Sequence, residues 1–239
     1  MTTVVRPYRG VSAEDRRADR RARLKAACLD LIGSGGVVWI TAEAVSARAG
    51  LTKRYFYESY ADRDALLYEV MDDFFVAVRT RILDALTEAG SGADAPRRAH
   101  IVAQVLIDYL QGDSRQARLY VEAAGQPTLQ ARREEAFDEF TRMLVDAFPS
   151  DAGHGAYVGD EAGEAAAGDA AAGGAPGEAP AKPIDTVTEQ RRVIAGLIIV
   201  AGTTQAAITW LQGRIELERD DVIAEIARLI LTAMSPRHT

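Results

Sequence analysis

The sequence predicts an all-α protein in which a small N-terminal helical domain precedes a larger helical bundle. Hydrophobic residues make up 48% of the chain but aromatic residues only 7%, a composition that favours helices over sheets. Apolar residues recur at helical spacing along most of the chain, as at Leu66, Val70 and Phe74. Glycine clusters and prolines fall between these periodic segments, where they are expected to end helices.

The first helix is expected to begin after Ser12, because Asp15 three residues later forms an imperfect capping box with it. It is expected to run to about Ile32 and to stop at the glycine-rich segment 33–36. Residues 1–11 are polar and basic and are expected to form a disordered arm.

Two short helices come next. Thr41 is a good N-cap for a helix that continues through Ala49 and ends at Gly50. Thr52 is expected to cap a second short helix that runs to about Glu58.

The rest of the chain is also periodic. Asp62 is expected to cap a long helix whose apolar face includes Leu67, Met71 and Phe75. Later periodic segments predict helices at about 97–111, 114–124, 127–148, 186–212 and 218–234.

The segment from Pro149 to Pro183 differs in composition from its surroundings. It consists mainly of Ala, Gly, Asp, Glu and Pro, so it cannot bury enough apolar surface to offset its ordering entropy. It is expected to be a flexible acidic loop inserted at the surface. The predicted division of the chain is a basic arm at 1–11, a first domain at 12–62 and a second domain at 63–239 with the loop at 149–183.

Charge is distributed unevenly. The whole chain carries −7, but residues 1–63 contain twelve Lys or Arg against seven Asp or Glu, a net +5 that leaves −12 for the remainder. The N-terminal end is therefore suited to approach a polyanion such as nucleic acid, although a run of solvated surface charge would have the same composition.

The most informative segment runs from Thr41 to Leu67. Two short helices joined by a tight turn at Gly50 are typical of a helix-turn-helix unit. Ala42, Val45 and Ala49 form a small apolar stripe along which the two helices can pack closely. The second helix opens with hydroxyl, cationic and aromatic side chains, the groups that read a major groove.

This segment resembles the N-terminal domain of the TetR family of bacterial regulators over about residues 20–70. Tyr60 stands where that family usually has Phe, and Arg63 stands where it usually has Lys; both keep the chemistry. The residues that carry the resemblance, in order, are Thr41, Gly50, Thr52, Tyr57, Tyr60, Arg63 and Leu66.

The resemblance and the residue chemistry together imply a DNA-binding surface. Thr41, Tyr57 and Arg63 would contact backbone phosphates, whereas Phe56 and Tyr60 would pack inside the domain. The alternative for Tyr57 is packing inside the domain, and the alternative for Lys53 and Arg54 is a solvated helix face. If the helix does bind DNA, the Arg54 guanidinium would contact a guanine edge. The predicted DNA-binding residues are Thr41, Thr52, Lys53, Arg54, Tyr55, Tyr57 and Arg63.

A basic arm could add phosphate or minor-groove contacts, the alternative being an idle tail. Its residues are Arg6, Arg9, Arg16, Arg17, Arg20 and Arg21.

The resemblance further implies a homodimer in which the last two helices of each subunit pair, and therefore a palindromic operator. An intrachain core is the alternative role for the same residues. The predicted interface residues are Ile194, Leu197, Ile198, Ala201, Ile208, Val222, Ile226, Leu229 and Ile230.

The resemblance also implies a cavity in the middle helices for a small-molecule effector. Polar residues within apolar helical runs are the candidates, and Glu122 among them could select a cation; ordinary core or surface positions are the alternative. The predicted ligand-binding residues are Gln104, Tyr109, Tyr120, Glu122, Thr204, Gln205 and Trp210.

Other functional classes lack their sequence signals. No nucleophile elbow, P-loop, HExxH or CxxC motif occurs, so the sequence predicts neither an enzyme nor a cofactor or metal site. The single cysteine, Cys28, has the spacing of a buried core residue. No apolar run approaches the length of a membrane span, and a cytoplasmic location is expected.

These inferences combine into one predicted function. The all-α chain, with an N-terminal three-helix helix-turn-helix domain and a bundle for ligand binding and dimerisation, is expected to be a homodimeric repressor that an effector releases from double-stranded DNA. A helix-turn-helix activator or adaptor, or an architectural DNA-binding protein without a ligand, is the alternative.

Overall fold

The computed structural model describes residues 12–123, 125–149 and 186–234. The predicted arm at 1–11 and nearly all of the predicted acidic loop lie outside these residues. Within them the structure contains helices and no strand, which confirms the all-α prediction. The elements are α1 Ala13–Gly35, the short 3-10 helix η1 Val37–Trp39, α2 Ala42–Ala49, α3 Lys53–Ser59, α4 Arg63–Ala89, α5 Ala95–Gly112, α6 Ser114–Ala123, α7 Pro127–Ala147, α8 Thr186–Leu211 and α9 Arg219–Met234.

The predicted helix boundaries follow from local hydrogen bonds. Ser12 and Asp15 form the complete capping box at the start of α1. Thr41 accepts a hydrogen bond from the Ala44 amide at 3.1 Å, and Gly50 ends α2 in the left-handed conformation with φ 63°. The first helix is longer than predicted, because it continues through segment 33–36 as far as Gly35.

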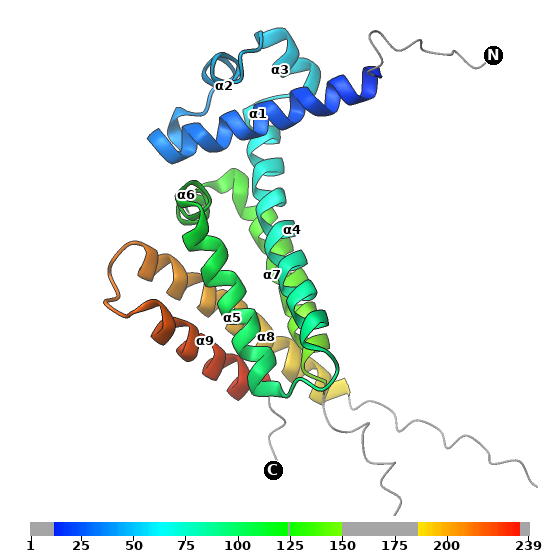
Figure 1. Cartoon of the computed structure of the whole chain (residues 1–239), viewed down its shortest axis with the longest axis vertical. Coiled ribbons are helices and arrows are strands. Elements are labelled where there is room, and N and C mark those ends of the chain that lie inside the picture. The colour runs from blue at the N-terminus through cyan, green and yellow to red at the C-terminus, as the bar shows by residue number, and fades with distance from the viewer. Residues whose placement is uncertain (1–11, 124, 150–185, 235–239) are drawn as a thin grey trace, which may run out of the picture.

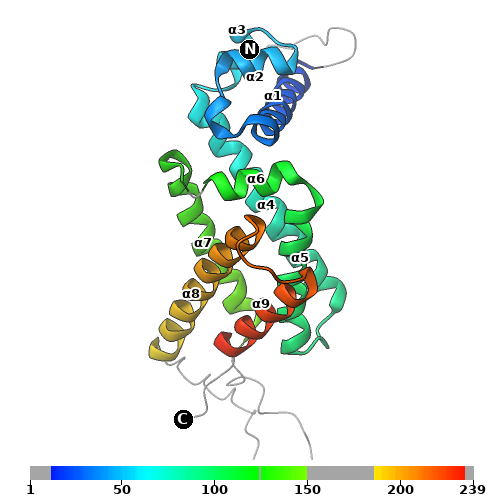
Figure 2. The same cartoon turned by 90° about the vertical axis from the view of Figure 1, so that its left-hand side faces the viewer.

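The helices form an elongated molecule with α1, α2 and α3 at one end (Figure 1). The long helix α4 leaves this end and runs beside α7 through the bundle, while α6 lies below α1. The two last helices, α8 and α9, lie next to one another on one face, which Figure 2 turns toward the viewer. The end formed by α1, α2 and α3 and the bundle are therefore connected by one continuous helix, α4.

A continuous core of buried apolar side chains connects the two ends. Leu24 and Phe56 are completely buried at the helix-turn-helix end, and Ile107 and Leu110 are completely buried in the bundle. Cys28 is also fully buried, and this burial raises the pKa of its thiol to about 12. The prediction of Cys28 as a core residue is therefore confirmed.

One segment of α8, Glu189–Leu211, is the only one among the described residues that is long and apolar enough to cross a membrane, and 28% of it is buried. This segment packs against α7 and α9. Near its start, the Arg192 guanidinium donates to the Val145 carbonyl oxygen at 2.7 Å. The helix is therefore an integral part of the bundle.

Candidate nucleic-acid interface

The helix α3 separates its side chains into an inner and an outer set. Phe56 is completely buried and Tyr60, which follows the helix, is 4% exposed, so both pack inside as predicted. On the outer side, Tyr57 is 58% exposed and the Arg54 side chain 84%. Of the seven predicted DNA-binding residues, six are exposed at this end of the molecule: Thr41, Thr52, Lys53, Arg54, Tyr55 and Tyr57.

The two cations of α3 already have anionic partners. Lys53 pairs with Glu43 of α2, and Arg54 pairs with Glu58 one turn later at 2.9 Å. The hydrogen bond from Arg54 to Glu58 raises the pKa of the arginine. Because exposed ion pairs are weak, a phosphate or base acceptor can replace these carboxylates at little cost.

The Tyr55 ring packs against an arginine of α1. The guanidinium of Arg20 on α1 lies 4.9 Å from the centre of the Tyr55 ring, in cation–π geometry. This contact orients the aromatic side chain at the first turn of α3.

The position of Arg63 differs from the prediction. Its side chain is half-buried, and Nη2 donates to the Val37 carbonyl oxygen at 3.0 Å. Its Nε is buried without a hydrogen-bond partner, and its charge acts on the buried Cys28 thiol. Arg63 is therefore turned toward α1 and η1, and a phosphate contact by this residue is not supported.

Part of the predicted basic arm is also used internally. Arg21 donates to the Ser59 carbonyl oxygen at 2.6 Å and pairs with Glu69 of α4. Its guanidinium lies 4.5 Å from the centre of the Tyr60 ring. These contacts hold α1 against α3 and α4, so Arg21 is a structural cation; Arg6 and Arg9 lie outside the described residues.

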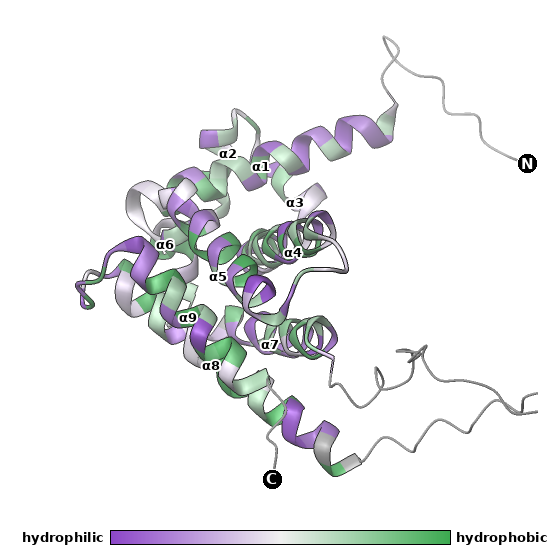
Figure 3. Ribbon diagram, turned by 60° about the horizontal axis from the view of Figure 1, so that its bottom comes forward, coloured by the Kyte–Doolittle hydropathy of each residue, from purple (hydrophilic) through white to green (hydrophobic). Residues whose placement is uncertain are grey.

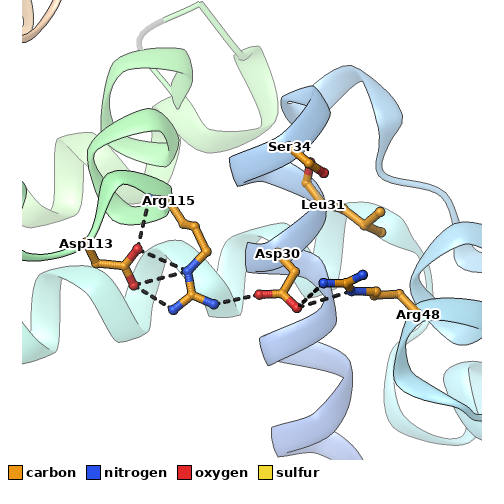
Figure 4. A network of polar contacts seen from close by, with 6 residues as sticks. All are labelled: Asp30, Leu31, Ser34, Arg48, Asp113 and Arg115. Carbon is orange, nitrogen blue, oxygen red and sulfur yellow. Dashed lines mark hydrogen bonds and ion pairs between the residues drawn. The ribbon is translucent and has the colours of Figure 1, made fainter.

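A polar network joins the helix-turn-helix end to the bundle (Figure 4). The Asp30 carboxylate of α1 accepts from Arg48 of α2 at 2.9 Å and from Arg115 of α6 at 2.6 Å. Arg115 is itself held by Asp113 at 2.7 Å. The sequence pattern did not predict this network, because Asp30, Arg48 and Arg115 lie far apart along the chain.

Glu122 belongs to the same junction and not to a ligand site. Its carboxylate accepts from the Val37 amide at 2.6 Å and from Arg118 at 2.6 Å. Arg118 also donates to the Gly33 carbonyl oxygen at 3.2 Å. The structure gives no support to a role of Glu122 in selecting a cationic ligand, since this residue does not line the bundle cavity and its carboxylate is paired at the α1–α6 contact.

A cavity of about 60 Å³ lies between α4, α5, α6, α7, α8 and α9. Of the predicted ligand-binding residues, only Tyr120 and Thr204 line it. The remaining lining residues are almost entirely apolar and were not predicted, because they have the same spacing as any core residue. They are Phe74, Phe75, Val78, Ile82, Val102, Leu106, Phe137, Phe140, Met143, Leu144, Ile199, Val200, Thr203 and Ile230.

The other predicted ligand residues lie elsewhere. Gln104 and Gln205 are exposed. Tyr109 borders a separate surface hollow, where the Arg81 guanidinium lies 4.5 Å from the centre of its ring. Trp210 donates from its indole to the Leu217 carbonyl oxygen at 2.9 Å and so fixes the turn between α8 and α9.

Comparisons with known proteins relate the arrangement to solved structures. No family model and no curated protein sequence matches the chain. A putative TetR-family transcriptional regulator from Rhodococcus sp. superposes with a TM-score of 0.63 at 15% identity, covering 91% of this chain and 100% of the other. The fatty acid degradation regulator FadR from Bacillus halodurans gives 0.62 at 11% identity, covering 89% and 94%. FadR from Bacillus subtilis in complex with stearoyl-CoA gives 0.60 at 13% identity, covering 89% and 98%.

The chain has the TetR-type fold. The sequence resemblance covered only about residues 20–70, whereas the structural likeness extends over about nine-tenths of the chain. In this TetR-type fold the exposed α3 is the second helix of the helix-turn-helix, and the cavity lies inside the second, larger helical part.

Helix α8 is built largely of hydrophobic residues (Figure 3), and several of them are exposed. Ile194 is 58% exposed and Ile198 65%, and Ala201 follows on the same face. Leu197, at 37%, extends this surface, and Leu229 of α9 is also exposed, at 41%. The exposed α8 residues Ile194, Leu197, Ile198 and Ala201 form the α8 face.

Four other predicted interface residues, one on α8 and three on α9, are not on that surface. They are nearly completely buried within the subunit, where α9 packs on α5 and α8. Burial within the single chain therefore favours the alternative role, an intrachain core, for Ile208, Val222, Ile226 and Ile230.

Among the described residues, no group of three or more His, Cys, Asp or Glu side chains is arranged to hold a metal ion.

Proposed function

We propose that this chain is a sequence-specific, DNA-binding transcriptional regulator that acts in the cytoplasm and not as an enzyme. The observation that carries the proposal is the outer surface of α3. Arg54, Tyr57 and their exposed neighbours project from a helix whose inner side is locked by Phe56 and Tyr60, in a fold shared with transcriptional regulators. A rigid helix with hydroxyl, cationic and aromatic groups on one side is suited to enter a major groove.

The regulator is proposed to act as a homodimer on a palindromic operator. A single helix-turn-helix reads only a few base pairs, so useful specificity requires two units related by a two-fold axis. The α8 face supports this proposal, because contiguous exposed apolar residues are costly in water and are typical of a subunit interface.

Repression with release by a small molecule is the proposed mode of regulation. The apolar cavity in the bundle supports an effector site. One structural neighbour is a fatty acid degradation regulator, and another was solved in complex with stearoyl-CoA. The Asp30 and Glu122 contacts join α6, which lines the cavity through Tyr120, to α1 and α2. Coupling through them would be reciprocal, so that effector weakens DNA binding by the same factor as DNA weakens effector binding.

The test is selection of bound duplexes from a random DNA library with the wild type and with Arg54→Ala, each at two salt concentrations. We expect the wild type to enrich one palindromic motif. The variant should lose about tenfold or more in discrimination at one symmetric pair of positions, because a bidentate guanine contact is lost. Arg228→Ala is the matched control, since Arg228 is also exposed and pairs with a carboxylate, Glu225, but lies on α9.

The same experiment separates the alternatives. Salt-sensitive binding without an enriched motif would contradict sequence-specific regulation and favour architectural binding, for which the net +5 of residues 1–63 is the supporting observation. An enriched motif whose occupancy raises transcription from a reporter would favour an activator or adaptor over a repressor.

A further inference from the structure

The bundle cavity has a polar end and an apolar end. Its hydroxyl groups come from Tyr120 on α6 and from Thr203 and Thr204 on α8, and no charged side chain lines it. The Tyr120 ring stacks on Phe74 with 5.1 Å between centroids. Ile82 lies eight residues further along α4, about 12 Å away at the helical rise per residue. The space is therefore elongated, with hydroxyl groups at one end and hydrocarbon at the other.

Arg133 of α7 lies next to one of the residues that line the cavity. Arg133 lies one turn before Phe137 on α7, and its guanidinium is 5.7 Å from the centre of that lining ring. Burial raises the pKa of Tyr120 to about 12, while a hydrogen bond with Thr204 and the charge of Arg133 act in the opposite direction. Through its contact with Phe137, Arg133 therefore lies at the edge of the lining, and its charge favours the ionised form of the Tyr120 phenol.

Among the described residues, Arg133 differs from the arginine beside it in having no anionic partner. Arg132 is 2% exposed and pairs with Asp72 at 2.8 Å and with Glu139 at 3.4 Å. Arg133 is half-buried and forms no ion pair within the part of the chain that the structure describes. A partly desolvated guanidinium without a carboxylate partner favours an anion that arrives with the ligand.

We propose that the cavity binds an apolar carboxylate, with its carboxylate on Arg133 and its hydrocarbon chain extending from Tyr120 toward Ile82. This inference rests on the proposed effector site and adds the chemical class of the ligand. The guanidinium presents two parallel N–H donors to a carboxylate, and the hydroxyls of Tyr120 and Thr204 supply further polar partners.

The cavity has to open to admit such a chain. Its volume of about 60 Å³ is smaller than the roughly 150 Å³ that accommodates benzene in an apolar core. Phe137 and Phe140 are only half-buried, and Met143 is flexible, so these three side chains of α7 are the ones expected to move. Movement in α7 would reach α8 directly, because the two helices pack together.

The test compares three probes that share a ten-carbon chain and differ in charge, each below its micelle concentration or solubility limit: decanoate, 1-decanol and decyltrimethylammonium. Binding to the full-length protein without DNA is measured by calorimetric titration and by the rise in unfolding temperature, which follows ligand concentration. We expect decanoate to bind at least about tenfold more tightly than 1-decanol, because a charge-assisted hydrogen bond is stronger than a neutral one. The cationic probe should not bind detectably.

Arg133→Gln should remove the preference. Decanoate affinity is expected to fall about tenfold, to the level of 1-decanol, while 1-decanol affinity stays within twofold of the wild type. Arg142→Gln is the matched control on the same helix, because Arg142 is exposed and, among the described residues, donates to the Asp138 carbonyl oxygen. Its decanoate affinity should be unchanged.

Equal affinity of the wild type for decanoate and 1-decanol would overturn the proposal, as would an unchanged preference in Arg133→Gln or failure of all three probes to bind. These outcomes are independent of the DNA selection. An enriched operator together with no decanoate binding would leave the regulator and reject this ligand class, whereas decanoate binding without an operator would keep the site and reject the regulator.

Discussion

At the residue scale, Gly36 shows how one missing side chain connects the two ends of the molecule. Its backbone has φ +91°, a conformation that side chains disfavour. A Cβ atom there would lie 2.7 Å from the Glu122 carboxylate, which binds the next amide, that of Val37. The close approach of α1 to α6 therefore requires glycine for two separate reasons.

Gly36→Ala should lower the free energy of unfolding by about 1–3 kcal/mol, because it adds backbone strain and displaces Glu122. Gly90→Ala is the matched control, since Gly90 has φ +77° but no atom within 4 Å of its Cβ position, so it reports backbone strain alone. Urea unfolding of both variants measures the difference. Equal losses would show that the Glu122 contact contributes nothing.

Among the helices, α1 is joined to two others, α2 and α6, by a single carboxylate, that of Asp30. Asp30 receives Arg48 from α2 and Arg115 from α6, and these hydrogen bonds lower the pKa of Asp30. The carboxylate is partly exposed, so its effect on stability is small, but it positions α2 relative to the bundle.

The pKa shift of Asp30 makes this contribution depend on pH. A lowered folded-state pKa stabilises the protein above the unfolded pKa of about 3.9, and this stabilisation is lost as pH falls through the folded value. Asp30→Asn should therefore be less stable than the wild type at pH 7, and the gap should shrink below about pH 4. Chemical unfolding at pH 7 and pH 3 measures this difference.

Asp84→Asn is the control for the pH experiment, because Asp84 is exposed on α4 and forms no ion pair among the described residues. A gap for Asp30→Asn that stays constant with pH would mean that its carboxylate charge is not what holds α1.

At the scale of the whole molecule, the TetR-type fold leaves the α8 face uncovered in a single chain. The exposed fractions of Ile194 and Ile198 exceed one half, whereas Ala207 and Ile208, further along the same helix, are buried. An apolar helix of this kind requires cover on more than one side. A second copy related by a two-fold axis would supply it.

Ile198→Asp should therefore convert a dimer into a monomer, because burying an unpaired carboxylate in an apolar interface is costly. Light scattering after size exclusion should give half the mass of the wild type. Binding to a palindromic duplex should fall about tenfold or more, because only one reading head remains. Leu83→Asp is the control, since Leu83 is 46% exposed on α4 and lies outside the α8 face. A dimeric Ile198→Asp would contradict the proposed interface.

Features that depend on neighbours within a few residues could be predicted from the amino-acid sequence. The caps at Ser12, Thr41 and Asp62, the left-handed Gly50 and the inward Phe56 were all predictable, because each depends on local hydrogen bonds or helical periodicity. The same local pattern carries the helix-turn-helix, which is why the resemblance was visible over that segment.

What each side chain faces depends on the packing of distant helices. Arg63 turns toward Val37, and among the described residues Arg132 has carboxylate partners where Arg133 has none. Ile226 is buried against the bundle, while Ile198 is exposed. Sequence spacing places a residue on one face of its own helix, but the rotation of that helix against helices distant along the chain decides whether the face meets core, cavity or solvent. Packing between distant segments sets that rotation, so the cavity and the polar junction appear only in the folded molecule.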